Sequence, residues 1–98
     1  MENDPIGTAS VSWLDSCGQV HLRVYSSDGY NVIERCWDSS GAWTNGGFNA
    51  PGDQVSATCW QSSAGANIRV YCNFEGKTVE YCWDAGGSGW YQGAYTTE

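Results

Sequence analysis

The sequence contains two copies of one unit, and this repeat limits the possible folds more than any other feature of the chain. From Val20, VHLRVYSSDGYNVIERCWD aligns without a gap with ANIRVYCNFEGKTVEYCWD, which begins at Ala66. The offset is 46 residues, and it becomes 47 beyond the CWD triplet, where GAWTNGGF from Gly41 faces SGWYQGAY from Ser88. Repeats of this length are typical of β-propeller blades. The chain is therefore expected to be built from two similar blades.

Each copy also has the local pattern of β-structure. In residues 22–25, apolar side chains alternate with Arg and Tyr, which is the period-two pattern of a strand with two different faces. Gly29 and Gly76 each follow an acidic residue, at a point where glycine readily adopts the positive φ of a hairpin turn. We expect an all-β single domain of two four-stranded antiparallel blades. The first blade is predicted over about residues 9–50 and the second over about residues 56–96.

Two blades cannot close a propeller on their own, because closed rings have about four to eight blades. A chain of 98 residues also buries only a modest fraction of its surface when it folds alone. Three chains would give six blades and would cover the exposed blade edges of each protomer, whereas two chains would give four blades. We expect a six-bladed propeller completed by trimerisation, a cyclic homotrimer, with a dimer as the alternative closure.

The charge of the chain excludes two classes of partner. Four basic residues face eleven acidic ones, for a formal net charge of -7, which repels nucleic acid and anionic membranes. Residues 1–7 lack the basic and apolar stretches of a signal peptide, and no segment approaches the roughly eighteen apolar residues of a membrane span. We expect a soluble chain without membrane insertion, and leave open whether it is secreted without a classical signal peptide.

The five cysteines are an odd number, so at least one stays unpaired if the others pair within the chain. Cys36 and Cys82 hold equivalent positions, each before a Trp, which favours small buried side chains in a repeated strand. The cysteines never occur as C-x-x-C and His21 is the single histidine, so the spacing of a zinc site is missing. We expect no metal site and no cofactor, and the pairing of the cysteines stays open.

Two of the four cationic side chains, Arg23 and Arg69, occupy the same position in the two copies, and so do Glu34 and Glu80. Neighbouring antiparallel strands would bring each Arg close to the Glu of its own copy. Such a pair could be an exposed salt bridge that contributes little, or it could offer donors and acceptors to a ligand. The spacing alone leaves both interpretations open.

The tryptophans favour a ligand. Six indoles in 98 residues exceed what the core of a thin blade can hide, so some of them should be partly exposed. An exposed indole offers a flat apolar platform to the C–H face of a pyranose, while an Arg and a carboxylate bind its hydroxyls. Trp13 and Trp60, which open the two copies, are instead expected to pack between blades. The residues thus predict a sugar site that occurs twice.

Four motifs occur in order and form the basis of a family resemblance: [IL]-R-V-Y, E-x-C-W-D, G-x-W-x-x-G-[AG]-[FY] and the joining F-N-x-P-G-D-x-V-S. From about Ser10 to Thr96, the chain resembles the small bacterial fucose-binding lectins that are related to the fungal Aleuria-type fucose lectins. The resemblance implies a carbohydrate-binding lectin in which three two-bladed chains form one six-bladed propeller. It also implies multivalent binding of L-fucose and fucosylated glycans between adjacent blades.

The resemblance further implies which residues bind the sugar. One site would use the first copy and the indoles of the second: Arg23, Glu34, the backbone at Gly47, Trp83 and Trp90. The other site would exchange the copies: Arg69, Glu80, the backbone at Ala94, Trp37 and Trp43. One of the two sites would span a subunit boundary. Whether they differ in affinity stays open, because Gly47 faces Ala94 and the loops before Trp43 and Trp90 differ in length.

Two other functions compete with the lectin interpretation. Glu34 and Asp38 are paired carboxylates, as in a glycoside hydrolase, but four residues along one strand separate them by roughly 13 Å. That exceeds the usual catalytic separation of up to about 9.5 Å, so we expect no enzymatic activity. A propeller whose aromatic surface binds another protein remains the alternative.

Overall fold

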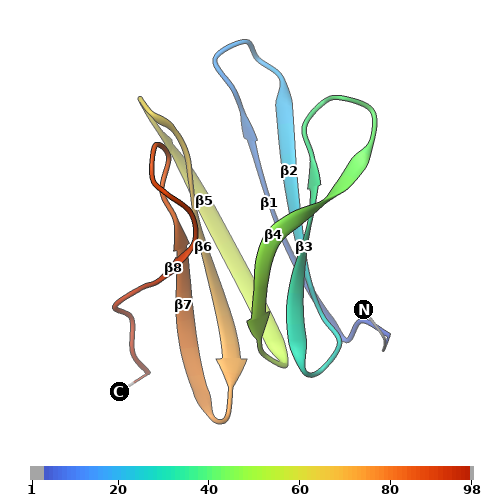
Figure 1. Ribbon diagram of the computed structural model, residues 1–98, viewed down its shortest axis with the longest axis vertical. Helices are drawn as coiled ribbons and strands as arrows, with labels where there is room; N and C mark the ends of the chain where they lie inside the picture. The colour runs from blue at the N-terminus through green and yellow to red at the C-terminus, as the bar shows by residue number, and fades with distance from the viewer. Residues whose placement is uncertain (1–3, 98) are drawn as a thin grey trace.

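The computed structural model describes residues 4–97, which form two four-stranded antiparallel sheets and no helix (Figure 1). The first sheet follows chain order and contains β1 (Gly7–Leu14), β2 (Val20–Ser27), β3 (Asn31–Trp37) and β4 (Trp43–Pro51). The second sheet does so too and contains β5 (Gln54–Ser62), β6 (Gly65–Phe74), β7 (Lys77–Trp83) and β8 (Tyr91–Gln92).

The prediction of an all-β chain with two four-stranded antiparallel units is confirmed. Across the described range, no helix is long and apolar enough to cross a membrane. Residues 1–3, which belong to the segment assessed for a signal peptide, and residue 98 lie outside the described residues.

Short turns join the second and third strands of each sheet, where the glycines predicted them. Between β2 and β3, Gly29 has a φ of 98°, and the Asp28 carboxylate accepts the backbone N–H of Tyr30 at 3.0 Å. Between β6 and β7 the turn consists of Glu75 and Gly76, which both have positive φ. These turns set the pairing register of the hairpins, and the register decides which side chains share a face.

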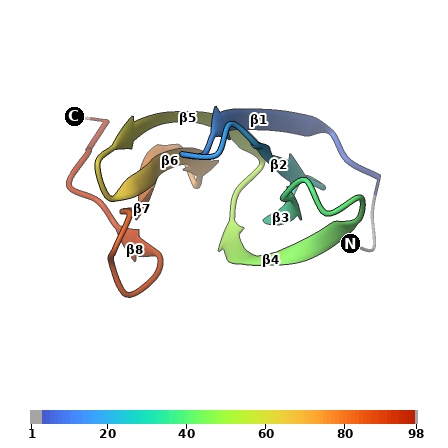
Figure 2. The same ribbon diagram turned by 90° about the horizontal axis from the view of Figure 1, so that it is seen from above.

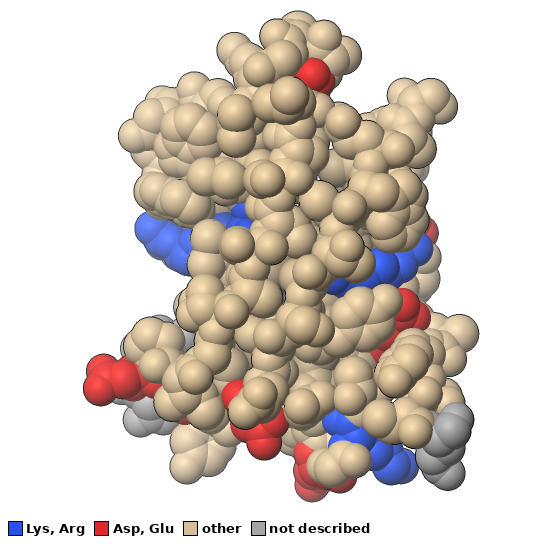
Figure 3. Space-filling model, turned by 180° about the vertical axis from the view of Figure 1, so that it is seen from behind, with Lys and Arg blue, Asp and Glu red and all other residues tan. Residues whose placement is uncertain are grey.

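The two sheets stand side by side and meet along their first strands. β1 and β5 lie next to one another, and the other strands of each sheet extend away from this pair (Figure 2). The Cys59 thiol donates to the Ser12 carbonyl at 3.3 Å, and the Gln61 amide donates to the Leu14 carbonyl. Seen from behind, the upper part of the molecule has few charged side chains (Figure 3). The arrangement is that of neighbouring propeller blades with their innermost strands in contact.

The chain passes from one sheet to the other through two residues, Gly52 and Asp53. The Gly52 N–H donates to the Tyr30 carbonyl, and the Asp53 N–H donates to the Asn73 carbonyl, both at 2.9 Å. A Cβ at position 52 would meet the Cβ of Cys72 at 2.9 Å, so glycine is required where the chain crosses. This link holds the second sheet directly beside the first.

A core of aromatic and aliphatic side chains fills the space between the sheets. The Tyr25 ring lies edge-on to Phe48 with centroids 5.6 Å apart, and Phe48 meets Trp90 at 4.7 Å. The buried cluster consists of Val11, Tyr25, Val32, Phe48, Ala50, Ile68, Val70 and Cys72. Full burial of a large apolar side chain contributes about 1.5–3 kcal/mol, so this cluster couples the two repeats into one unit.

Only one face of each sheet is packed against the other sheet. The packed face of the first sheet is not the repeat equivalent of the packed face of the second. In β2, Tyr25 is 0% exposed and the adjacent Val24 is half-buried, whereas in β6 Val70 is 0% exposed and Tyr71 is half-buried. Tyr25 and Tyr71 are equivalent in the repeat, and so are Val24 and Val70. Within the described chain, the Val24 face of the first sheet and the Tyr71 face of the second therefore have no other sheet packed on them, and we call these the uncovered faces.

Three of the five cysteines behave as small buried apolar residues. Cys36 and Cys82 are buried, as expected, and so is Cys72. All five cysteines lie in the described range, and each is a free thiol. Burial raises the pKa of the Cys72 thiol to about 11, so it stays protonated at neutral pH.

Candidate ligand-binding site

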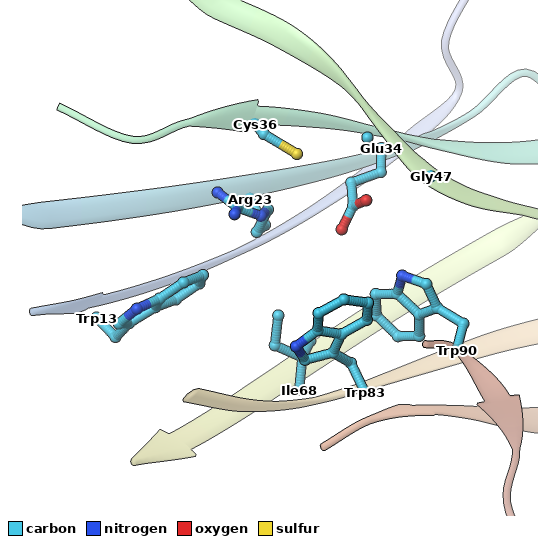
Figure 4. Close-up of a pocket in the computed structure, with 9 residues that line it drawn as sticks. Trp13, Arg23, Glu34, Cys36, Gly47, Ile68, Trp83 and Trp90 are labelled. Atoms are coloured by element: carbon cyan, nitrogen blue, oxygen red, sulfur yellow. The ribbon is translucent and has the colours of Figure 1, made fainter. Parts of the chain in front are cut away.

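A cleft with a volume of about 320 Å³ opens between the two sheets (Figure 4). The first sheet contributes the charged side chains of one wall, together with Trp13 and Cys36, and the second half of the chain lines the opposite wall with apolar side chains. The lining residues are Trp13, Arg23, Glu34, Cys36, Gly46 and Gly47 from the first sheet, and Ile68, Trp83 and Trp90 from the second half. All five residues predicted for the first site therefore line one cleft.

Glu34 is fixed in place by the strands on both sides of it. The residue is 6% exposed, its Oε2 accepts the Tyr25 hydroxyl at 2.8 Å, and its Oε1 accepts the Phe48 N–H at 3.3 Å. Burial, followed by the charge of Glu34, raises the pKa of Tyr25 far above its ordinary value, so the hydroxyl remains a donor. A Cβ at Gly46 would lie 1.9 Å from Glu34 Oε1, so the carboxylate needs a glycine beside it.

Arg23 is held by contacts that leave much of its guanidinium free. Its Nη1 donates to Asp38 Oδ1 and to the Leu22 carbonyl, both at 2.8 Å. The guanidinium carbon lies 5.0 Å from the centre of the Trp13 ring, within the range of a cation–π contact. These contacts occupy one nitrogen and one face of the group, so the other N–H groups can donate to a ligand.

His21 connects Asp38 to the loop between β1 and β2. Its Nδ1 lies 2.6 Å from Asp38 Oδ1, its Nε2 lies 2.8 Å from Asp15 Oδ2, and its ring stacks on Trp13 at 5.2 Å. The hydrogen bonds to Asp38 and Asp15 raise the pKa of His21, which favours the doubly protonated ring that can donate to both carboxylates. Asp15, His21, Asp38 and Arg23 thus form one continuous polar chain.

Arg23 and Glu34 do not neutralise each other directly, although the sequence suggested such a pair. The register of β2 and β3 sets Arg23 opposite Cys36 and Tyr25 opposite Glu34. Each charged group consequently has its own partner, Asp38 for Arg23 and the Tyr25 hydroxyl for Glu34. Both groups remain available to a ligand in the cleft.

The opposite wall of the cleft is a fixed apolar surface. Trp83 is 38% exposed, and its ring centroid lies 5.8 Å from that of Trp90 with the planes tilted by 53°. Trp90 is anchored because its ring also packs edge-on against Phe48 and Tyr25 of the core. Ile68, which is buried, completes this wall. In Figure 4 the two indoles lie across the gap from Arg23 and Glu34.

The residues predicted for the second site do not meet within one chain. Arg69 and Glu80 lie on the uncovered face of the second sheet, with the exposed Ala94 in the segment after β8. Trp37 and Trp43 are paired across β3 and β4 on the uncovered face of the first sheet. The two halves of this set therefore point away from each other in the single chain.

The polar half of the second set nevertheless repeats the geometry of the first. The Tyr71 hydroxyl donates to Glu80 Oε2 at 2.8 Å, and the Tyr95 N–H donates to Glu80 Oε1 at 3.2 Å. Arg69 Nη1 lies 2.9 Å from Asp84 Oδ1, as Arg23 Nη1 does from its aspartate at 2.8 Å. The repeat in the sequence is thus also a repeat of side-chain contacts.

Some cleft residues were not predicted from the sequence, and one tryptophan outside the cleft was misplaced. Trp13 packs against the core, as expected, but it also lines the cleft. Trp60 is 48% exposed and stacks on Arg69 at 4.8 Å, so it does not pack between the two sheets of one chain. Gly46 was missed as well, although its recurrence as Gly93 in the second copy was a visible signal.

Comparison with known proteins adds an independent finding. The family model described as a fungal fucose-specific lectin matches residues 4–86, which span the whole first sheet and the second sheet through β7. No curated protein matches the sequence.

Proposed function

This chain belongs to the fungal fucose-specific lectin family and is a carbohydrate-binding lectin, and from that premise we propose that it binds L-fucose in the cleft between its two sheets. The match over residues 4–86 confirms the predicted relation to the Aleuria-type fucose lectins. Fucose binding is supported by the cleft itself, where a fixed carboxylate and a guanidinium on one wall face two indoles on the other.

The polar wall suits a neutral ligand that is rich in hydroxyl groups. Glu34 would accept hydrogen bonds from sugar hydroxyls, while Arg23 would donate to a hydroxyl and to the ring oxygen. The backbone at Gly47 would add a further contact at the rim. Because one partner in each of the first two contacts is charged, these hydrogen bonds are shorter and stronger than bonds between neutral groups.

The apolar wall would distinguish fucose from other hexoses. Trp83 and Trp90 would pack against the C–H face and the methyl group of the sugar. Fucose has a methyl group where galactose has a hydroxymethyl group, and an apolar surface leaves that extra hydroxyl without a partner. We therefore expect L-fucose to bind in preference to galactose.

The second site would form between chains. The uncovered face of the first sheet bears Trp37 and Trp43, and the uncovered face of the second bears Arg69 and Glu80, with Ala94 beside them. Packing one face on the other would repeat the contact that the two sheets already make within one chain. Three chains close a six-bladed homotrimer in this way. Several sites on one rigid ring would give avidity for surfaces that display many fucosylated glycans.

A glycan array with competition tests the proposed ligand. We expect selective retention of fucosylated glycans, displacement by free L-fucose but not by galactose, and recovery of the bound glycans intact, because the proposal includes no catalysis. Uniform or absent retention across the array would reject fucose binding and would favour the alternative of a protein ligand. Release of free sugar from the glycans would instead indicate a hydrolase.

A further inference from the structure

A second groove lies beside the cleft, where the loop between β1 and β2 approaches the loop between β5 and β6. Residues 13–16 and 61–65 line it, and its volume is about 530 Å³. Both loops lie at the upper end of the molecule (Figure 1). The groove has a defined shape because the Gln61 amide donates to the Leu14 carbonyl and so ties the two hairpins together.

The groove and the cleft are adjacent because Trp13 lines both of them. In Figure 4, Trp13 lies at one end of the cleft and Trp90 lies toward the other. The polar chain described above connects the same two places, since Asp15 lines the groove and Arg23 lines the cleft. A ligand that extends from the cleft past Trp13 therefore enters the groove.

The groove lining offers hydrogen-bonding groups and contains no Lys or Arg. Its polar lining consists of the hydroxyls of Ser16, Ser62 and Ser63, the Gln61 amide and the Asp15 carboxylate. Hydroxyl and amide groups bind neutral hydroxyls, and the lining has no Lys or Arg side chain that could bind an anion. Seen from behind, this upper end shows acidic atoms but no Lys or Arg atoms on its surface (Figure 3). The lining thus fits a neutral saccharide and disfavours an acidic one.

We propose that this groove is a subsite for the neutral sugar residues that are linked to the terminal sugar in the cleft. The proposal rests on the proposed fucose binding, because the groove adds a second contact only to a glycan whose terminal sugar occupies the cleft. Its volume exceeds that of the cleft, so at least one more sugar ring fits. The protein would then recognise an oligosaccharide and not only its terminal monosaccharide.

Titration calorimetry with methyl α-L-fucoside and with a neutral fucosylated trisaccharide tests this subsite. The Arg69→Ala background restricts binding to the cleft within the chain. We expect the trisaccharide to bind about three- to tenfold more tightly than the monosaccharide, the gain from one or two additional hydrogen bonds. A trisaccharide of the same linkage with a carboxylate on its second sugar should lose this gain. Ser63→Trp, which fills the groove, should remove the gain while the affinity for methyl α-L-fucoside stays unchanged.

Lys77→Trp is the matched control, because it adds the same side chain at the start of β7, at the other end of the sheet, and it should keep the gain. If Ser63→Trp does not fold, the double variant Ser16→Ala and Ser63→Ala removes two lining hydroxyls and should reduce the gain. Absence of binding by either sugar overturns the proposed fucose site itself. Binding of methyl α-L-fucoside with no trisaccharide advantage, or with an advantage that survives the groove variants, overturns only the subsite.

Discussion

The two copies of the repeat hold their Glu with the same kinds of hydrogen bond but differ in what lies opposite that Glu. Glu34 and Glu80 each accept a tyrosine hydroxyl at 2.8 Å and one backbone N–H. Glu34 is 6% exposed and faces the indoles of the second sheet, whereas Glu80 is half-buried and lies on a face that no other sheet covers within the described chain. The sequence of a blade therefore builds half of a site, and a neighbouring blade must supply the rest.

The largest effect that we expect from this difference between the copies follows the removal of one arginine at a time. We expect Arg23→Ala to weaken sugar binding in the cleft within the chain at least about 100-fold, because charged hydrogen bonds of about 1.5–3 kcal/mol each are lost. Arg69→Ala should have the same effect on the site between chains. Each variant should therefore show half of the wild-type stoichiometry in a calorimetric titration with methyl α-L-fucoside.

Lys77→Ala removes an exposed cation outside both sites and should leave the stoichiometry unchanged. Dilution to the monomer should abolish the Arg69 site and preserve the Arg23 site, because only the latter is complete in one chain. A stoichiometry that neither arginine substitution alters would contradict both assignments. A protein that is monomeric at micromolar concentration would contradict the site between chains alone.

A second test uses the glycines that make room for the two carboxylates. A Cβ at Gly46 would lie 1.9 Å from Glu34 Oε1, and a Cβ at Gly93 would lie 2.1 Å from Glu80 Oε1. We expect Gly46→Ala to lower the free energy of unfolding by about 1–3 kcal/mol, because Glu34 is buried and cannot move aside without losing its partners. Gly93→Ala should cost less at the carboxylate, because Glu80 is half-buried and can turn toward solvent, and its remaining cost comes from Cys82 Sγ, which the Cβ would meet at 2.7 Å.

Urea unfolding measures both effects, and Gly47→Ala is the matched control. Nothing lies within 4 Å of a Cβ at Gly47, and the second copy already has Ala94 at this position. Equal losses for Gly46→Ala and Gly47→Ala would show that the crowding around the carboxylate has no energetic consequence.

Much of the fold could be predicted because its signals are local. Apolar alternation in residues 22–25 and the turn glycines at positions 29 and 76 depend on a few neighbouring residues, and the repeat shows that both copies fold alike. Which face of each blade is covered could not be predicted. Tyr25 is buried and the equivalent Tyr71 is half-buried, a difference that arises from the order of the two blades and not from their residues.

The site was predicted in its composition but not in its contacts. Arg23 and Glu34 both line the cleft, yet the expected pair between them is replaced by contacts to Asp38 and Tyr25. This outcome depends on the register of β2 and β3, which is set by the turn at residues 28–31. Strand alternation shows which side chains share a face, but it does not show which residue of the next strand lies opposite.

A third test removes the hydroxyl that holds each carboxylate. Tyr25→Phe should lower the free energy of unfolding by about 1–2 kcal/mol, because it leaves buried Glu34 without one of its donors. Tyr71→Phe should cost less than about 1 kcal/mol, because water can replace the hydroxyl at half-buried Glu80. Thermal unfolding of the monomeric protein compares the two variants. Equal losses in the monomer would contradict the difference in burial between Glu34 and Glu80.

The smallest expected effect concerns His21, which stands where the second copy has Asn67. Hydrogen bonds to Asp38 and Asp15 raise the pKa of folded His21 above its ordinary value of 6.5. A raised pKa means that the folded state binds the proton more tightly, so the stabilisation is complete below about pH 6.5 and is lost as the pH rises through the folded pKa. At the acidic side, the hydrogen bond from His21 lowers the pKa of Asp15, and the hydrogen-bond stabilisation of that carboxylate is lost as the pH falls below 3.8.

His21→Asn makes the first copy resemble the second and should remove this pH dependence. We expect the wild type to exceed the variant in unfolding free energy between about pH 4 and pH 6.5, by less than about 1 kcal/mol for the His21–Asp38 pair, since partly exposed ion pairs contribute no more than that. The difference should shrink toward pH 9, because neutral His21 can donate to only one of its two carboxylate partners. Urea unfolding at pH 5 and pH 9 measures it. A difference that is the same at both values would mean that folding does not raise the pKa of His21, and the two copies would then differ only in what covers them.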